Sequence, residues 1–322
     1  MTTQQTPETG VTAAPLRRPE VEDAAARIAG RVRRTPVLTV DHDGAPLALK
    51  LEHLQHTGTF KPRGMFNRLL TAQESGELTD AGVVAASGGN AGLAVAYAAG
   101  ILGVRAEIYV PEVISAAKAE RLRRLGATVV VGGAGYADAL TAARRRIGET
   151  GALEVHAYDQ RAVCAGQGTV GLELLDQAEV DTILVAVGGG GLMAGITAAA
   201  AGHASVVAVE PENLPTLHDA LDAGGPVDID VDTTAVAADS LGARRVGDIA
   251  FATAAANYVR SVLVRDDEIV TARRRLWDEC RIVVEHSGAA AFAAILGKRY
   301  QQKTGERVAV ICCGANTDPA GL

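Results

Sequence analysis

Short apolar runs rich in β-branched residues alternate along the chain with longer alanine- and leucine-rich stretches at helical spacing. The run ILVAV at 183–187 is apolar at every position, which is typical of a central strand covered on both faces. The alternation predicts an α/β fold with one or two largely parallel sheets flanked by helices. Strands are predicted at residues 47–51, 82–86, 106–110, 128–131, 182–187, 206–210, 261–264 and 307–311.

Charge and hydropathy exclude two classes of partner. The 38 acidic residues outnumber the 31 basic ones, and the arginines are scattered over predicted helix faces instead of forming one basic stripe. Residues 81–104 carry no charge, but six glycines together with Ser87 and Asn90 favour a strand, a turn and a buried helix over a membrane span. We therefore expect neither a nucleic acid nor a membrane as a partner.

Cysteine spacing and the first residues bear on the compartment. Cys164, Cys280, Cys312 and Cys313 form no CxxC pair, so neither a zinc site nor a disulfide framework is expected, and a reducing cytoplasm is favoured. The beginning of the chain is polar, contains three prolines and lacks a signal-peptide pattern, which predicts a disordered tail over residues 1–20.

Lys61 lies in a turn rich in glycine and threonine, within KLEHLQHTGTFKPRG at residues 50–64. Met65, Phe66 and Leu69 follow at helical spacing, which places the lysine at the start of an amphipathic helix. The backbone amides and partial positive charge at a helix start lower the pKa of an ammonium, and a neutral amine forms an imine with an aldehyde. This segment alone leaves a covalent anchor and an ordinary solvated lysine equally open.

Three further glycine turns follow predicted strands, namely ASGGNAG at 86–92, VGGGGLMAG at 187–195 and CCGAN at 312–316. Ligands bind at the carboxyl ends of parallel strands, so we expect these turns to converge on one crevice with Lys61. The cluster of polar groups around Ser87 and Asn90 suits a carboxylate, although an ordinary helix cap by either side chain fits as well.

The turn at 187–195 has three interpretations. Its bare N–H groups before a predicted helix form a cradle for a phosphate. Gly189, Gly191 and Ala194 also fit the G-x-G-x-x-A dinucleotide pattern, and Glu210 ends a strand 21 residues after Gly189, so a nicotinamide-dependent dehydrogenase has to be considered. A turn whose glycines only permit close packing is the third. Cys313 is either an ordinary buried cysteine or a weak, neutral partner of a ring nitrogen.

Taken in order, these segments resemble the serine/threonine dehydratase family, which are pyridoxal-phosphate enzymes of fold type II, the tryptophan-synthase β-like fold. The resemblance begins near residue 21 and covers nearly all of the chain after it. It rests on RRTPVL at 33–38, the lysine segment, ASGGNAG, AGQGTVGLE at 165–173, VGGGGLMAG, EHSGAAA at 285–291 and CCGANTD at 312–318.

The resemblance implies two domains with the cofactor in the cleft between them, and Lys61 as the lysine that forms a Schiff base with pyridoxal phosphate. The large domain is expected at 21–74 and 157–322, and the small domain at 75–156. The expected catalytic residues are Lys61 and Ser87. The other implied roles are the cofactor phosphate for Gly188, Gly189, Gly190, Gly191 and Leu192, the ring hydroxyl for Asn90, the ring face for Phe60, the pyridine nitrogen for Cys313, and the substrate carboxylate for Ser87, Gly88, Asn90 and Ala91.

The implied reaction is a β-elimination that converts L-threonine or L-serine into a 2-oxo acid and ammonia, with Lys61 as the base that takes the Cα proton. Cys313 as a thiol cannot keep the ring nitrogen protonated as a carboxylate would. Serine racemases of the family carry a second serine after the position of Ser87, where this chain has Gly88, so we expect little racemisation. A specialised substrate such as 3-hydroxyaspartate or phenylserine, and an amino-acid sensor without turnover, remain alternatives.

The resemblance also bears on metal and assembly. The family's cation site often uses a glutamate where Glu210 stands, but Leu214 and Thr216 replace the usual small and acidic companions. We therefore expect no divalent ion, and leave a monovalent cation or none as the alternatives. A homodimer is expected from the family. The chain ends soon after CCGANTD, so no isoleucine-binding regulatory domain is expected.

Overall fold

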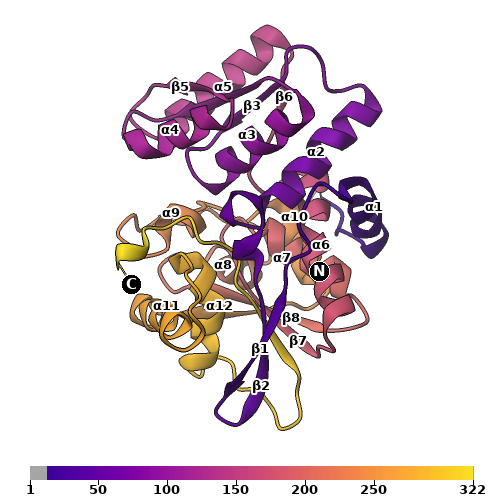
Figure 1. Ribbon diagram of the computed structural model, residues 1–322, viewed down its shortest axis with the longest axis vertical. Coiled ribbons are helices and arrows are strands. Elements are labelled where there is room, and N and C mark those ends of the chain that lie inside the picture. Colours follow the sequence, from indigo (N-terminus) through magenta and orange to yellow (C-terminus); the bar gives the residue numbers. More distant parts are fainter. Residues whose placement is uncertain (1–12, 322) are drawn as a thin grey trace, which may run out of the picture.

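The computed structural model describes residues 13–321 and places their strands in two sheets (Figure 1). One sheet has the order β1-β2-β10-β7-β8-β9 and the other the order β5-β4-β3-β6. Adjacent strands run parallel except in the antiparallel hairpin of β1 and β2, which confirms the predicted α/β class. The strands are β1 (Val37–His42), β2 (Ala45–Lys50), β3 (Val83–Ala86), β4 (Ala106–Val110), β5 (Thr128–Val131), β6 (Leu153–Glu154), β7 (Thr182–Ala186), β8 (Ser205–Pro211), β9 (Arg260–Val264) and β10 (Val308–Ile311).

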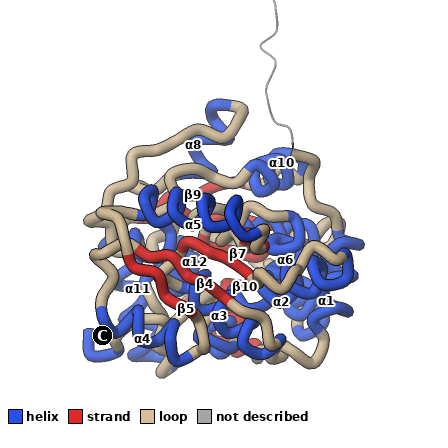
Figure 2. Tube along the Cα trace, turned by 90° about the horizontal axis from the view of Figure 1, so that it is seen from above, coloured by secondary structure: helices blue, strands red, loops and turns tan. Residues whose placement is uncertain are grey.

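Helices surround both sheets (Figure 2). Three short 3-10 turns are also present, at Glu52–Leu54, His56–Gly58 and Pro319–Gly321. The α-helices are α1 (Arg18–Ile28), α2 (Lys61–Ser75), α3 (Asn90–Leu102), α4 (Ala116–Arg124), α5 (Tyr136–Thr150), α6 (Arg161–Gln177), α7 (Gly191–Ala200), α8 (Thr216–Ala223), α9 (Ala238–Leu241), α10 (Asp248–Ala256), α11 (Asp266–Cys280) and α12 (His286–Leu296).

The four-stranded sheet is covered on both faces. In β3, Val83 and Ala85 belong to a core shared with α2 and α3, whereas Val84 and Ala86 pack with Ala139 and other residues of α5. Successive side chains of a strand point to opposite faces, so these two cores are the two sides of one sheet. This double cover explains why β3 is apolar at every position.

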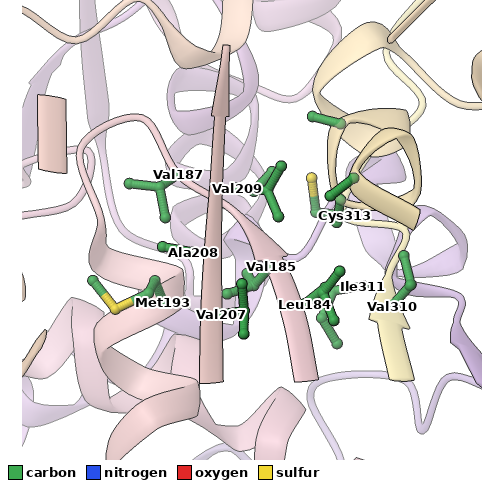
Figure 3. Close-up of a cluster of buried hydrophobic side chains, with 14 of the residues drawn as sticks. Leu184, Val185, Val187, Met193, Val207, Ala208, Val209, Val310, Ile311 and Cys313 are labelled. Carbon is green, nitrogen blue, oxygen red and sulfur yellow. The ribbon is translucent and has the colours of Figure 1, made fainter. Parts of the chain in front are cut away.

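The six-stranded sheet encloses the largest core. Every residue of β7 is buried, and β7 lies between β10 and β8, as its uninterrupted apolar sequence predicts. Figure 3 shows side chains of these three strands gathered with Met193 of α7 and with Cys313, which follows β10. Both β7 and β10 are therefore packed in this core, and the carboxyl end of each strand is followed by one of the glycine turns.

The structure corrects the sequence predictions for the beginning of the chain and for two strands. The predicted tail extends too far, because α1 begins at Arg18, Leu16 is only 3% exposed and its N–H donates to Thr253 Oγ1 at 2.9 Å. The part of the predicted tail before residue 13 lies outside the described residues. The sequence prediction also missed β1 and β6. In β1 no residue is fully buried, and β6 has two residues, so neither produces a strong apolar run.

The chain crosses from one sheet to the other and back. The four-stranded sheet uses strands between residues 83 and 154, and the six-stranded sheet uses strands from both sides of that segment. The limits of the two domains, 21–74 with 157–322 and 75–156, stay a prediction. No helix between residues 13 and 321 is both long and apolar enough to span a bilayer.

Candidate active site

Backbone hydrogen bonds hold the Lys61 turn against the turn that follows β10. Phe60, the residue before α2, donates its N–H to the carbonyl of Cys313 at 3.2 Å, and Thr59 forms a β-bridge with Gly314. Ala315 donates in turn to the carbonyl of Gly58 at 2.9 Å. The structure thus brings together two of the segments that the sequence analysis expected to converge.

The amine of Lys61 is isolated from carboxylates. Its Nζ donates to the carbonyl of Ala157 at 2.8 Å and lies 5.1 Å from the centre of the Phe60 ring, and it forms no ion pair with any described residue. Burial lowers the pKa of Lys61 to about 8, against the opposing fields of Cys313, Cys164 and Glu285. The predicted lowering is thus found, but burial is its principal cause.

A buried ion network fixes the first turn of α2 on its other side. The Arg63 guanidinium contacts both carboxylate oxygens of Glu52, at 2.7 and 2.8 Å, and Glu173 at 3.0 Å. Arg63 and Glu52 are almost fully buried, so removing one of these partners would strongly lower the free energy of unfolding. Because Lys61 is two residues before Arg63, the network limits where the amine can lie.

The glycine loop at Gly188–Gly191 leads directly into α7. Gly190 has φ of 84°, a conformation that favours glycine, and α7 starts without a side-chain cap. A Cβ atom at Gly189 would lie 2.3 Å from the Tyr158 ring, and one at Gly188 would lie 2.8 Å from the Leu241 backbone. Packing therefore requires these glycines, while the uncapped N–H groups still offer an anion site, so both of these interpretations hold together.

Thr216 ties the glycine loop to Glu210. Its hydroxyl donates to the Gly188 carbonyl at 2.6 Å and lies 3.2 Å from Glu210 Oε1. Glu210 is fully buried, and it also accepts from the N–H groups of Leu217 and His218 and from the Ser261 hydroxyl. Burial raises the pKa of Glu210 despite these donors. Within residues 13–321, no group of three His, Cys, Asp or Glu side chains is arranged to hold a metal ion.

The turn after β3 presents Ser87 and Asn90 at the start of α3. Neither side chain caps the helix, which removes the alternative that either residue is an ordinary cap. Asn90 Nδ2 donates to Glu285 Oε1 at 2.8 Å, and Asn90 Oδ1 accepts from Asn316 Nδ2 at 2.7 Å. The Ser87 hydroxyl accepts only a long contact, 3.4 Å, from the N–H of Gly89. Ala91 is buried in the first turn of α3.

Cys313 follows β10 and is a protonated thiol. It is 4% exposed, its Sγ–H donates to the carbonyl of Ser287 at 3.4 Å, and burial raises its pKa to about 12. Glu285 accepts from the Ser287 hydroxyl at 2.7 Å, and burial raises the pKa of Glu285 as well. Burial thus makes Cys313 and Glu285 harder to ionise, and they place less negative charge near Lys61 than an ionised thiolate and carboxylate would.

Sequence reasoning missed several members of this site. Glu285, Asn316 and Gln167 stand in motifs that carried the family resemblance, but only the fold shows that they face the Asn90 turn or the glycine loop. Ala157 contributes its backbone carbonyl, which no sequence pattern reveals. Tyr158 precedes the AGQGTVGLE motif, and its ring covers Gly189. The glycine makes this contact possible, but the sequence does not show which residue makes it.

The family model for pyridoxal-phosphate dependent enzymes matches residues 28–314, so the chain belongs to this family. This membership selects pyridoxal phosphate over the dinucleotide interpretation of the glycine loop. The fold is that of the fold type II enzymes, as the sequence motifs predict.

Among curated proteins, an L-threonine ammonia-lyase of Geobacter sulfurreducens is 37% identical over 306 residues, covering 92% of this chain and 75% of the relative. A phenylserine dehydratase of Ralstonia pickettii is 37% identical over 303 residues, covering 92% and 91%. Among solved structures, maize serine racemase is 31% identical with a TM-score of 0.87, covering 95% of each chain.

Proposed function

We propose that this enzyme removes water and then ammonia from a β-hydroxy amino acid, either L-threonine or L-serine, and so produces a 2-oxo acid. The observation that carries the proposal is the Lys61 amine, which is partly buried, hydrogen-bonded to one carbonyl and free of any carboxylate partner among the described residues. A threonine ammonia-lyase and a phenylserine dehydratase among the relatives support the reaction class.

The residues fit the cofactor that the family requires. Bound pyridoxal phosphate supplies an aldehyde for an amine and an electron-withdrawing ring that stabilises negative charge at the substrate Cα. We assign Lys61 to the aldehyde and the glycine loop with Leu192 to the phosphate, because α7 begins there with uncapped N–H groups. We assign the ring hydroxyl to Asn90, the ring face to Phe60 and the ring nitrogen to Cys313.

Lys61 also serves as the base in this proposal. With a pKa of about 8, roughly a tenth of its amine is neutral at about pH 7, and this neutral form accepts the proton from the substrate Cα. The Cys313 thiol, with its pKa near 12, does not protonate the ring nitrogen. A ring nitrogen held by this neutral thiol would withdraw electrons less strongly than a protonated one, which suits loss of the β-hydroxyl better than transamination.

The start of α3 is proposed to hold the substrate carboxylate. Its first N–H groups lack a side-chain cap, and the Ser87 hydroxyl has no short hydrogen bond among the described residues. Gly88, Asn90 and Ala91 supply the backbone around this position.

The test is an assay of the cofactor-loaded enzyme with L-threonine, L-serine and phenylserine, with 2-oxo acid and ammonia as readouts. Equal amounts of oxo acid and ammonia from threonine or serine support the proposal and rank the two. Turnover of phenylserine alone would replace the substrate while keeping the reaction. Formation of D-serine without oxo acid would contradict the proposal.

Racemisation is the second candidate, and the similarity to maize serine racemase is the observation in its favour. Gly88 opposes it, because a serine there is the second acid that the racemases of the family use. A Cβ atom at Gly88 would lie 2.9 Å from Ile114 Cδ1, so introducing a serine requires this side chain to move. Chiral analysis of serine recovered from the assay measures the racemase share directly.

We further infer a cytoplasmic homodimer that works without a divalent ion. The Glu210 carboxylate already accepts three hydrogen bonds, from the N–H groups of Leu217 and His218 and from the Ser261 hydroxyl, and this disfavours a cation there. Light scattering of the purified enzyme tests the dimer. Activity after treatment with EDTA, and in sodium-only against potassium-containing buffer, tests the two kinds of cation.

A further inference from the structure

Gln167 is a buried amide without a hydrogen-bond partner. The residue is 0% exposed, and neither its Nε2 nor its Oε1 has a partner within the described residues. Most buried polar side chains in proteins are bonded, and an orphaned one calls for an explanation such as a bound group. Gln167 belongs to the AGQGTVGLE motif, to which the proposed mechanism gives no role.

Two tight helix contacts fix where the Gln167 side chain lies. A Cβ atom at Gly166 would lie 2.5 Å from the Arg63 carbonyl in α2, and one at Gly168 would lie 2.5 Å from the Gly195 carbonyl in α7. The backbone of α6 is therefore locked between these two helices on either side of Gln167. Its side chain has little freedom to turn away.

The amide lies between the lysine helix and the glycine loop. Gln167 Cγ is 2.9 Å from the Cβ position of Gly64, one turn after Lys61, and Gln167 Oε1 is 2.8 Å from the Cβ position of Gly191. Gly191 is the first residue of α7, whose start carries no side-chain cap. A larger residue at Gly64 or Gly191 would displace the amide from this place.

Cys164 lies on the same face of α6 as Gln167, but its side chain has a hydrogen-bond partner. Cys164, one turn before Gln167, donates its thiol to the Tyr158 carbonyl at 3.0 Å. With no partner for either amide atom, nothing in the protein fixes which of them faces the loop. A neutral amide next to a helix N-terminus suits an anionic oxygen, because its NH2 group donates while the helix end contributes partial positive charge.

We propose that Gln167 donates a hydrogen bond to the phosphate group of the cofactor and so completes the site formed by the glycine loop. This inference rests on the proposed function, since it concerns the same cofactor. Gln167 is a binding residue that contributes to phosphate affinity. The side chain is held in its orphaned state by the helices, and the bound phosphate satisfies it.

The test compares Gln167→Met with Gln177→Met. Gln177 is a glutamine on the same helix whose amide is satisfied, since it donates to the Thr35 carbonyl at 2.9 Å and accepts from Lys50 Nζ at 2.7 Å. We expect Gln167→Met to weaken binding of pyridoxal phosphate at least tenfold while raising the melting temperature of the apoenzyme. Gln177→Met should lower that temperature and leave the affinity unchanged.

Pyridoxal, which lacks the phosphate, separates the phosphate contact from any effect on Lys61. Its affinity should be the same for Gln167→Met and wild type. The proposal is overturned if the variant binds pyridoxal phosphate as tightly as wild type, if both ligands lose affinity equally, or if the variant apoenzyme is less stable or fails to fold. Failure of the proposed function is a separate result, seen as a wild-type enzyme that binds the cofactor but releases no 2-oxo acid.

Discussion

Two lysines of this chain, the buried Lys50 and the partly buried Lys61, have opposite surroundings. Lys50 ends β2 and donates to three acceptors, the Thr35 carbonyl at 2.7 Å, Glu173 at 2.6 Å and Gln177 at 2.7 Å. Lys61 begins α2 and has one acceptor among the described residues, the Ala157 carbonyl. One ammonium is thus fully compensated, whereas the other keeps N–H groups without partners.

In the proposed mechanism, this difference keeps Lys50 charged and makes Lys61 reactive. Burial lowers the pKa of both, but Glu173 and Glu52 oppose that shift at Lys50. At Lys61 the opposing groups are two cysteines and a carboxyl group whose own pKa values are raised by burial. Withholding an ionised partner makes the neutral amine accessible near physiological pH.

The largest effect is expected from Lys61→Ala. Loss of both the covalent anchor and the proton acceptor should lower lyase turnover by roughly 10⁴-fold or more. The apoenzyme should keep its free energy of unfolding, because the change removes a partly buried and poorly compensated charge. Steady-state assays and urea unfolding measure the two, with Lys118→Ala at an exposed ion pair as the control. A Lys61→Ala variant that retains turnover would show that Lys61 is not the reactive lysine.

The reverse pattern is expected from Lys50→Met. It removes one member of a buried network and leaves the Glu173 carboxylate and the Gln177 amide oxygen without their Lys50 donor, while the Thr35 carbonyl keeps only Gln177 as a donor. The free energy of unfolding should therefore fall by about 3 kcal/mol. Activity per folded molecule should change little, since Arg63 still contacts Glu173 and Glu52. Denaturant titration combined with active-site counting measures both. A Lys50→Met variant that stays stable but loses turnover would show that Lys50 serves the reaction and not the stability of the fold.

The pH dependence of reconstitution sharpens the comparison. In the proposed mechanism only the neutral Lys61 amine reacts with the cofactor aldehyde, and its pKa of about 8 makes the neutral fraction rise until the pH exceeds that value. The rate at which apoenzyme takes up pyridoxal phosphate should increase roughly tenfold between about pH 7 and pH 9 and then level off. Stopped-flow absorbance follows it. A rate that keeps rising tenfold per pH unit past pH 9 would indicate an unshifted lysine.

A smaller effect is expected at the other end of the site, from Thr216→Val. The valine cannot donate to the Gly188 carbonyl, which loosens the glycine loop and should weaken cofactor binding by about fivefold, the equivalent of about 1 kcal/mol. Thr216→Ser keeps the hydroxyl and should bind as wild type does. Equilibrium dialysis against pyridoxal phosphate measures the three affinities. Equal affinity of the valine and serine variants would remove Thr216 from the account.

Much of this arrangement could be predicted from the sequence because it depends on strong local patterns. The apolar run of β7 predicts a central strand, and glycine turns after β3, β7 and β10 predict a shared crevice, where the structure does bring Asn90 and Asn316 together. The start of α2 at Lys61 follows from the apolar residues behind it. These features need only one segment at a time, or a general rule about parallel sheets.

The rest depends on contacts between distant segments, which periodicity cannot report. The Ala157 carbonyl is defined by backbone position and not by residue type. The donors to Glu210, which are two N–H groups of α8 and the Ser261 hydroxyl, can be recognised only in the fold. Leu16 lies in a polar, proline-rich stretch, yet one hydrogen bond and its burial hold it in place. The absence of a partner for Gln167 can be recognised only when all of its neighbours are known.

The most direct test of the two-lysine account is borohydride reduction of the cofactor-loaded enzyme, followed by peptide mass spectrometry. The chain has five lysines, so each can be followed separately. The account predicts the phosphopyridoxyl label on Lys61 in nearly every molecule and no label on Lys50. A label on Lys50, or on any other lysine in place of Lys61, would contradict it.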